Sequence, residues 1–277
     1  MASVKSYEHE LPVSEWPEWK WFDSIDKLLG ETLSNVQERN SSEVGTLYPF
    51  LDAIAESLAT FRTLVNQLKL RDAYVIARVI YETSVNACSL LTDPEELSTR
   101  ASTHAKQKAL RTLIRAIELA GDQIFEFKPD HAEEILGHPQ HQEWLREFTS
   151  RSGREITSWT PENVQQRLEA TYLKFGPEET RGLAFGLLLY RHASEIAHGT
   201  LYGTLFSWGA MEPSRPLTGP DDMGKFRRRE LRHLLKLVSF SLESVVRIAG
   251  SVLDIADVCV LARKARSDYY EQRKKDA

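Results

Sequence analysis

The chain has 277 residues, of which 42% are hydrophobic and 27% are charged, and its formal net charge is -5. A chain of this length and composition can bury a substantial core, which excludes an intrinsically disordered protein. The modest net charge gives no support to a protein held on nucleic acid by bulk electrostatics, although residues 221–277 carry thirteen Lys/Arg against nine Asp/Glu.

The cysteines and the apolar segments indicate the compartment. The only two cysteines, Cys88 and Cys259, lie in apolar helical patterns, so we expect neither a disulfide framework nor a thiolate metal site. The first twenty residues contain four glutamates and no continuous apolar stretch, which argues against a signal peptide. The most apolar window, residues 238–262, is interrupted by four charged residues, so we expect no membrane span and a cytoplasmic protein.

The N-terminal region is acidic and rich in tryptophan. Residues 1–22 include Trp16, Trp19 and Trp21 without a sustained helical period, so we interpret them as an arm that leads into a helix near Asp23. We expect the tryptophans to attach this arm to the body of the protein, because aromatic area mainly serves cores and interfaces. Residues 23–277 are then predicted to form a single helical domain.

Helical periodicity dominates the next part of the chain. Residues 47–68 repeat apolar side chains at three- and four-residue steps, and residues 71–91 are apolar around most of the helix, which predicts a central position. Asp93 and Pro94 are a typical cap and first residue of another helix, which we expect to run to about Ala120.

The second half of the chain is also predicted to be helical after an interruption. We interpret residues 124–160 as a loop-rich surface insertion, followed by helices that begin near Thr160 and at Pro177. A Pro/Gly-rich loop past Gly209 precedes a long helix over about 225–270. We find no strand alternation with hairpin turns, so the prediction is an all-α helical bundle with its core at about 47–203.

One polar strip follows the helix that begins at Pro177. At about 100° per residue, Arg191, Glu195, His198 and Tyr202 fall within an arc of roughly 60°, on a helix that is otherwise apolar and is therefore expected to be buried. Glu195 can bridge Arg191 and His198, each one turn away. An imidazole beside a carboxylate and a guanidinium suits proton transfer next to an anionic group.

A similar strip follows the helix over residues 71–91. Arg78 and Glu82 lie one turn apart on it, and if the two strips face each other, they would line one crevice with His198 and Tyr202. His192 lies about 100° from Arg191 and is not expected to share that crevice. The alternative is that both strips are solvated edges or structural ion pairs.

Two segments resemble known families. The segments YRHASEIAHG (190–199) and ARVIYETSVNACSLLTDPEEL (77–97) resemble a bacterial helical family of unknown function over roughly 47–203. The first segment is also similar to the signature of the HEPN superfamily, in which an Arg is followed by a polar residue and, four to six positions later, by a His. Here His192 follows Arg191, and six residues separate Arg191 from His198.

The HEPN resemblance implies a function. Active HEPN proteins are metal-independent ribonucleases that work as dimers. By this resemblance His198 would activate the ribose 2′-hydroxyl and Arg191 would hold the scissile phosphate. Glu195, within the motif, is the third candidate catalytic residue and would hold His198 ready for proton transfer, and the supporting candidates are Arg78, Glu82, Ser194 and Tyr202.

The implied partners are RNA and a second copy of the chain, with no small-molecule cofactor, and the implied setting is a bacterial toxin or antiphage defence system. The alternative is a noncatalytic helical scaffold that binds a protein partner.

Two further features leave alternatives open. Glu195 and His198 form half of the carboxylate-bridged dimetal pattern of helical bundles, but the sequence has no second half, so we expect no metal. The basic segment 225–233 opens the last helix, where cations oppose the helix dipole. We expect it either to contact RNA phosphates or to pair with the acidic N-terminal region.

Overall fold

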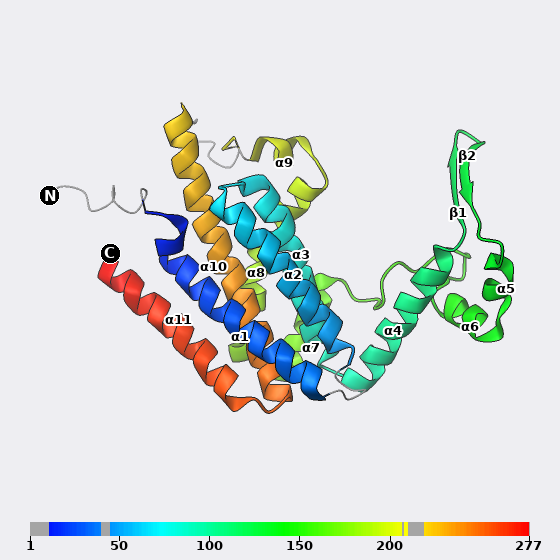
Figure 1. Cartoon of the computed structure of the whole chain (residues 1–277), viewed down its shortest axis with the longest axis horizontal. Coiled ribbons are helices and arrows are strands. Elements are labelled where there is room, and N and C mark those ends of the chain that lie inside the picture. Colours follow the sequence, from blue (N-terminus) through cyan, green and yellow to red (C-terminus); the bar gives the residue numbers. More distant parts are fainter. Residues whose placement is uncertain (1–10, 40–44, 207, 210–218, 277) are drawn as a thin grey trace. The chain divides into compact units, whose positions relative to one another are not determined.

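The computed structural model describes residues 11–39, 45–206, 208–209 and 219–276. Over these residues the chain forms eleven α-helices, one short 3₁₀ helix, η2 (Val13–Glu15), and one two-stranded sheet (Figure 1). The all-α prediction is confirmed. The chain divides into two compact units, residues 1–92 with 164–277 and residues 93–163, whereas the sequence predicts one domain over residues 23–277.

The first unit is a helical bundle built around α3 (Leu70–Leu90). As its apolar circumference predicts, α3 is buried on most sides and contacts α2 (Leu47–Asn66), α8 (Pro177–Ala197) and α10 (Pro220–Val252). α8 also packs on α10, so these three helices form the centre of the unit. The shorter α7 (Val164–Phe175) contacts α3 and α8, and it begins later than the expected start near Thr160.

Two glycines allow α8 to approach its neighbours closely. A Cβ atom at Gly182 would lie 1.9 Å from the backbone carbonyl oxygen of Phe240 on α10, and one at Gly186 would lie 2.2 Å from the ring of Tyr81 on α3. Any larger side chain would push the helices apart.

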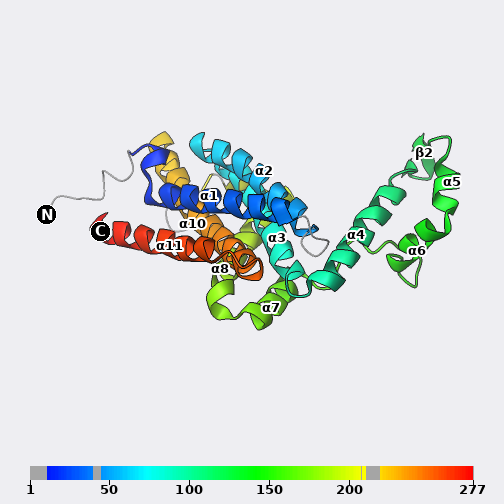
Figure 2. The same ribbon diagram turned by 60° about the horizontal axis from the view of Figure 1, so that its bottom comes forward.

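The N-terminal tryptophans belong to the core rather than to an arm. α1 (Pro17–Arg39) begins six residues before the expected start near Asp23, with a proline at its first position, so the expected arm is wrong for residues 17–22. Trp16, Trp19 and Trp21 are buried, and Trp21 packs against aromatic rings of α10 and α11 (Ala256–Asp276). In Figures 1 and 2, α1 lies between α2 and α11. Residues 1–10 lie outside the described part.

The C-terminal region contains two helices where one was expected over 225–270. α10 ends at Val252, and α11 begins at Ala256 after a turn in which Asp254 adopts a left-handed backbone conformation with φ of 54°. α11 packs on both α10 and α1. The single-helix prediction is wrong because packing against α1 and α10 outweighs the continuous helical pattern. Residues 210–218 of the Pro/Gly-rich loop lie outside the described part.

The second unit contains α4 (Pro94–Arg111), α5 (Ala132–Gly137), α6 (Pro139–Glu147) and the strands β1 (Arg115–Leu119) and β2 (Asp122–Phe127). Asp93 accepts a hydrogen bond from the backbone N–H of Glu96, which confirms the predicted cap. The predicted extension of this helix to Ala120 is wrong. α4 ends at Arg111, and β1 and β2 form an antiparallel hairpin whose turn is Ala120 and Gly121, both with positive φ. This unit spans residues 93–163, so it is longer than the loop-rich insertion expected over 124–160.

The second unit has a small core. Its buried apolar side chains include Leu110, Ala132, Phe148 and Trp159. Arg111 donates hydrogen bonds to the backbone carbonyls of Leu145 and Phe148, which tie α6 to α4.

No helix within the described part of the chain is long and apolar enough to cross a membrane.

Candidate functional site

The strip on α8 lies on an exposed edge of the first unit. Arg191, Glu195 and His198 are exposed, while Leu189, Ala193 and Ile196 on the opposite side of the helix are buried. α8 is less buried than its composition predicts, because Phe185 and Leu188 are also exposed, with Leu188 at 65% of its surface. The strip is therefore a mixed polar and apolar surface.

The three strip residues make no side-chain hydrogen bond or ion pair within the described chain. Glu195 does not bridge Arg191 and His198, so that expectation is wrong. Exposed ion pairs gain little over full hydration, and nothing in the fold holds these side chains together. Ser194 is half-buried, and its backbone carbonyl accepts the N–H of His198 at the end of α8. The charges of Arg191 and Glu195 and the ring of His198 remain available to a ligand.

Tyr202 reaches the site from a different helix. α8 ends where Gly199 takes a left-handed conformation with φ of 65°, and Tyr202 lies on the next helix, α9 (Leu201–Phe206). The prediction that Tyr202 continues the strip assumes one continuous helix, so it is wrong. α9 folds closely against the end of α8, since a Cβ atom at Gly203 would lie 2.4 Å from the backbone oxygen of Glu195.

His192 lies in the site beside Tyr202, although the sequence predicts that it lies apart from the polar strip. The hydroxyl oxygen of Tyr202 lies 3.2 Å from Nδ1 of His192, and the two rings are stacked. Burial raises the pKa of the Tyr202 hydroxyl, Arg191 opposes this shift, and Glu195 and Glu230 add to it. Arg191, His192, Glu195 and Tyr202 therefore lie near one another at the junction of α8 and α9.

The strip on α3 meets a different residue of α8. Arg78 and Glu82 pair with each other at 3.1 Å, and the Arg78 guanidinium lies 5.2 Å from the centre of the Tyr190 ring. Burial raises the pKa of the Tyr190 hydroxyl, and a hydrogen bond to the carboxylate of Glu82 adds to the shift. In the described chain no hydrogen bond or ion pair joins Arg78 or Glu82 to the α8 strip, so the expected shared crevice is not formed by direct contact.

Exposed apolar side chains also lie on the helices that carry the strip. The described large apolar side chains that are exposed on α8, on α9 and just after it are Phe185, Leu188, Leu201, Leu205 and Trp208. Exposed apolar surface of this kind is typical of binding sites.

The basic segment 225–233 is largely used within the protein. Nε of Arg232 lies 2.9 Å from Oε2 of Glu18, and the Tyr269 hydroxyl donates to Oε1 of the same carboxylate at 3.3 Å. Arg228 also donates to the backbone oxygen of Leu11. Pairing with the acidic N-terminal region is thus confirmed at Glu18. Contact with RNA stays a prediction for the exposed Lys225.

A buried ion network that the sequence patterns did not predict joins the start of α8 to α10. Arg247 is 2% exposed, with Nε 2.8 Å from Glu179 and Nη1 3.4 Å from Glu243. Arg266 of α11 also contacts Glu243 at 3.2 Å. Burial raises the pKa of Glu243. The one signal in the sequence is that Glu243 and Arg247 lie one helical turn apart. Because every member pairs within the chain, these charges are not available to a ligand.

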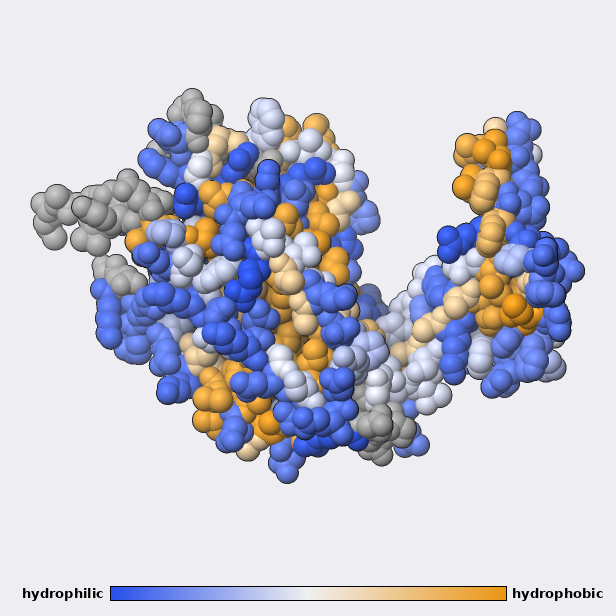
Figure 3. Space-filling model, in the orientation of Figure 1, coloured by the Kyte–Doolittle hydropathy of each residue, from blue (hydrophilic) through white to orange (hydrophobic). Residues whose placement is uncertain are grey.

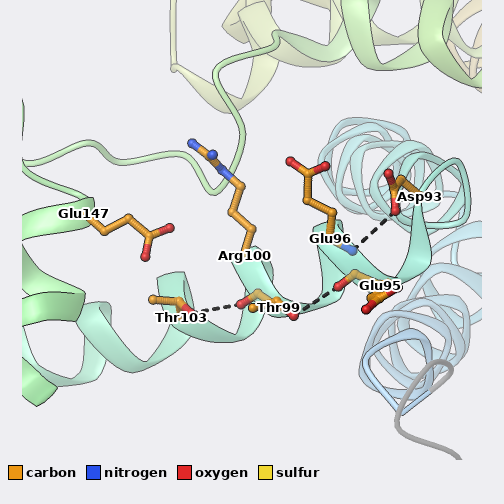
Figure 4. A pocket seen from close by; sticks show the side chains of 7 residues that line it. All are labelled: Asp93, Glu95, Glu96, Thr99, Arg100, Thr103 and Glu147. Carbon is orange, nitrogen blue, oxygen red and sulfur yellow. Dashed lines mark hydrogen bonds between the residues drawn. The ribbon is translucent and has the colours of Figure 1, made fainter.

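The second unit contains an acidic hollow of about 520 Å³ on α4 (Figure 4). Glu147 of α6 points toward α4 in this view. Asp93 caps α4, and Nε of Arg100 donates to the backbone oxygen of Trp159 at 2.7 Å, so both side chains have structural roles. The hollow is lined by Asp93, Glu95, Glu96, Thr99, Arg100, Thr103 and Glu147.

The fold and the site define a mainly α-helical protein in which the exposed Arg191 and His198 and the half-buried Tyr202 lie at the junction of α8 and α9. Within the described residues no group of three or more His, Cys, Asp or Glu side chains is arranged to hold a metal ion. The chain belongs to a family of unknown function, DUF5677, whose sequence model matches residues 47–210. That segment runs from α2 to α9 and agrees with the resemblance to a helical family of unknown function. No curated protein and no solved structure matches the chain.

Proposed function

We propose that the chain is a HEPN-like endoribonuclease that cleaves RNA without a metal ion at the junction of α8 and α9. The observation that carries this proposal is a contrast between arginines of the same unit. The half-buried Arg232 and the buried Arg247 are both paired with carboxylates, whereas the exposed Arg191 has no side-chain partner. His198 is exposed and unpartnered as well, so neither residue is needed to hold the described fold.

The proposed reaction uses the 2′-hydroxyl of RNA as the nucleophile. An imidazole removes its proton, the 2′-oxygen bonds to phosphorus, and the bond to the 5′-oxygen breaks as that oxygen takes up a proton. The products are a 2′,3′-cyclic phosphate and a free 5′-hydroxyl. Arg191 would hold the phosphate oxygens and stabilise the added negative charge. His198 would be the base, and His192, beside Tyr202, would supply the proton to the leaving oxygen.

The proposal includes a homodimer. The exposed Leu188 and Leu201 lie on the helices that carry the strip, and apolar surface of this kind is typical of protein interfaces. A two-fold contact through these side chains would bring two copies of the strip together.

The test is cleavage of end-labelled single-stranded RNA in EDTA by purified variants. We expect His198→Ala and Arg191→Ala each to lower the cleavage rate at least ~100-fold, the range typical of lost acid–base or oxyanion groups. Arg181→Ala is the matched control, because Arg181 is exposed on the same helix ten residues earlier. The RNA ends are identified by mass spectrometry. Wild-type protein that leaves RNA intact, or equal losses in Arg181→Ala and Arg191→Ala, would refute the proposal.

The second candidate is a noncatalytic scaffold that binds a protein partner at the same edge. The observation that favours it is the exposed apolar surface of α9, where Leu201 is 75% exposed. In this case Leu201→Ser weakens partner binding while Arg191→Ala leaves binding unchanged, and wild-type protein shows no cleavage. Since Arg191 and His198 are exposed and unpaired, neither function predicts a lower melting temperature for their alanine variants.

A further inference from the structure

The hairpin of the second unit exposes an unusual amount of apolar surface. All eleven residues of β1 and β2 are exposed, and each large apolar side chain on them exposes half of its surface or more. An isolated two-stranded hairpin is at best marginally stable in water, and unpartnered apolar surface on a sheet is typical of a binding site. These large apolar residues are Ile117, Leu119, Ile124, Phe125 and Phe127.

The pairing of the strands places most of these side chains on one face. Ile117 pairs with Phe125 and Arg115 pairs with Phe127, and directly paired residues share a face of the sheet. A bulge between Ile117 and Glu118 leaves Ile124 as the extra residue of β2. Figure 3 shows apolar side chains gathered along one side of the hairpin and polar side chains along the other.

The polar face of the hairpin is acidic. Alternation and pairing put Glu118 and Glu126 on the face opposite Ile117, whereas Asp122 pairs with Leu119 on the same face as Ile117. Arg115 is the one basic residue within the two strands, against three carboxylates. Neighbouring Lys128 pairs with Glu133 at 2.5 Å. A surface with this excess of carboxylates over basic groups repels phosphate. This argues against RNA or an anionic membrane as the binding partner of the hairpin.

The size of the hairpin argues against a second copy as the occupant. Strands of five and six residues at about 3.3 Å per residue give a face about 20 Å long and about 10 Å wide, or about 200 Å². A stable interface needs about 800 Å² on each partner. Two hairpins that stack on their apolar faces would fall well short of this area.

We propose that the β1–β2 hairpin is a docking element that inserts into an apolar groove, rimmed by Lys or Arg, on a different protein. Insertion uses the apolar face, the acidic face and the two open strand edges together, so it covers more surface than stacking on one face. The strand edges can pair with the partner's backbone, as in recognition by strand addition. The basic rim would neutralise Glu118 and Glu126.

The first step of the test finds the partner with the full chain. Benzoylphenylalanine replaces Phe125 in the chain expressed in its native cells, and light-induced adducts are identified by mass spectrometry. The same replacement at Leu173 is the matched control, because Leu173 is an exposed apolar residue of the first unit. An adduct formed only at position 125 with a different protein is expected. No adduct, or an adduct only with a second copy of the chain, would overturn the proposal.

The second step measures the affinity of the purified partner. We expect Phe125→Ser to weaken binding at least ~10-fold, as the loss of an aromatic anchor does, and Leu173→Ser to leave binding unchanged. The double variant Glu118→Gln, Glu126→Gln should bind more weakly and lose most of its salt dependence. Equal affinity of wild type and Phe125→Ser, or tighter binding by the double variant, would overturn the proposal. Circular dichroism of each variant verifies that the helices are intact.

Discussion

Replacement of Gly182 by alanine tests the helix contact that positions the candidate site. A Cβ atom at this position would lie 1.9 Å from the backbone oxygen of Phe240, whereas ordinary contact begins at 3.4 Å, so α8 and α10 would have to separate by about 1.5 Å. The obstacle is backbone, which cannot rotate away as a side chain can. We expect the free energy of unfolding to fall by about 3 kcal/mol, at the upper end of the usual cost of overpacking.

Thermal unfolding followed by circular dichroism measures this effect. For a unit of about 200 residues, a loss of about 3 kcal/mol lowers the melting temperature by roughly 6–12 °C. Gly30→Ala is the matched control, because Gly30 lies in the middle of α1 with no atom within 4 Å of the added Cβ. Alanine there should stabilise the protein by about 0.5–1 kcal/mol. A Gly182→Ala protein that melts within roughly 2 °C of wild type would refute the close α8–α10 contact, and with it the position of the strip.

Two further predictions concern buried polar groups. Arg232→Met leaves the buried carboxylate of Glu18 without its guanidinium and should lower the free energy of unfolding by about 3 kcal/mol or more in urea denaturation. Lys27→Met, which breaks an exposed pair, should change it by less than about 1 kcal/mol, and equal losses would contradict this account. Burial raises the pKa of Tyr74, Tyr81 and Tyr269 above the unfolded value near 10, so the stability that they contribute is present below about pH 10 and is lost as the pH rises further. In a titration followed at 295 nm, three of the nine tyrosines should ionise only when the helices unfold, and ionisation of all nine near pH 10 in the folded protein would contradict this.

The long helices were predictable because their buried apolar residues recur at helical spacing. The start of α8 at Pro177 and the cap of α4 at Asp93 follow from local backbone chemistry, and the structure has both. The hairpin was missed because a bulge interrupts its alternation and because a fully exposed hairpin has no buried face to enforce a pattern. The signal that could have found it is Ala120-Gly121 between two segments rich in apolar residues.

The candidate site was predictable only where it stays on one helix. Periodicity placed Arg191, Glu195 and His198 on one edge of α8, as the structure has them. It could not place Tyr202, because the left-handed Gly199 ends the helix and redirects the chain. The contact between Tyr202 and His192 depends on that change of direction.

Local sequence determined the helical class of this protein, the starts of α2, α3, α4 and α8, and the edge of α8 that carries the strip, because helices form from interactions within a few residues of the chain. Tertiary structure alone decided which of these groups meet. Glu18 and Arg232 form a part-buried pair although they lie 214 positions apart, while Glu195 and His198, three positions apart, form no side-chain hydrogen bond or ion pair. Such pairing depends on the burial of whole helix faces, which the order of residues within one helix does not specify.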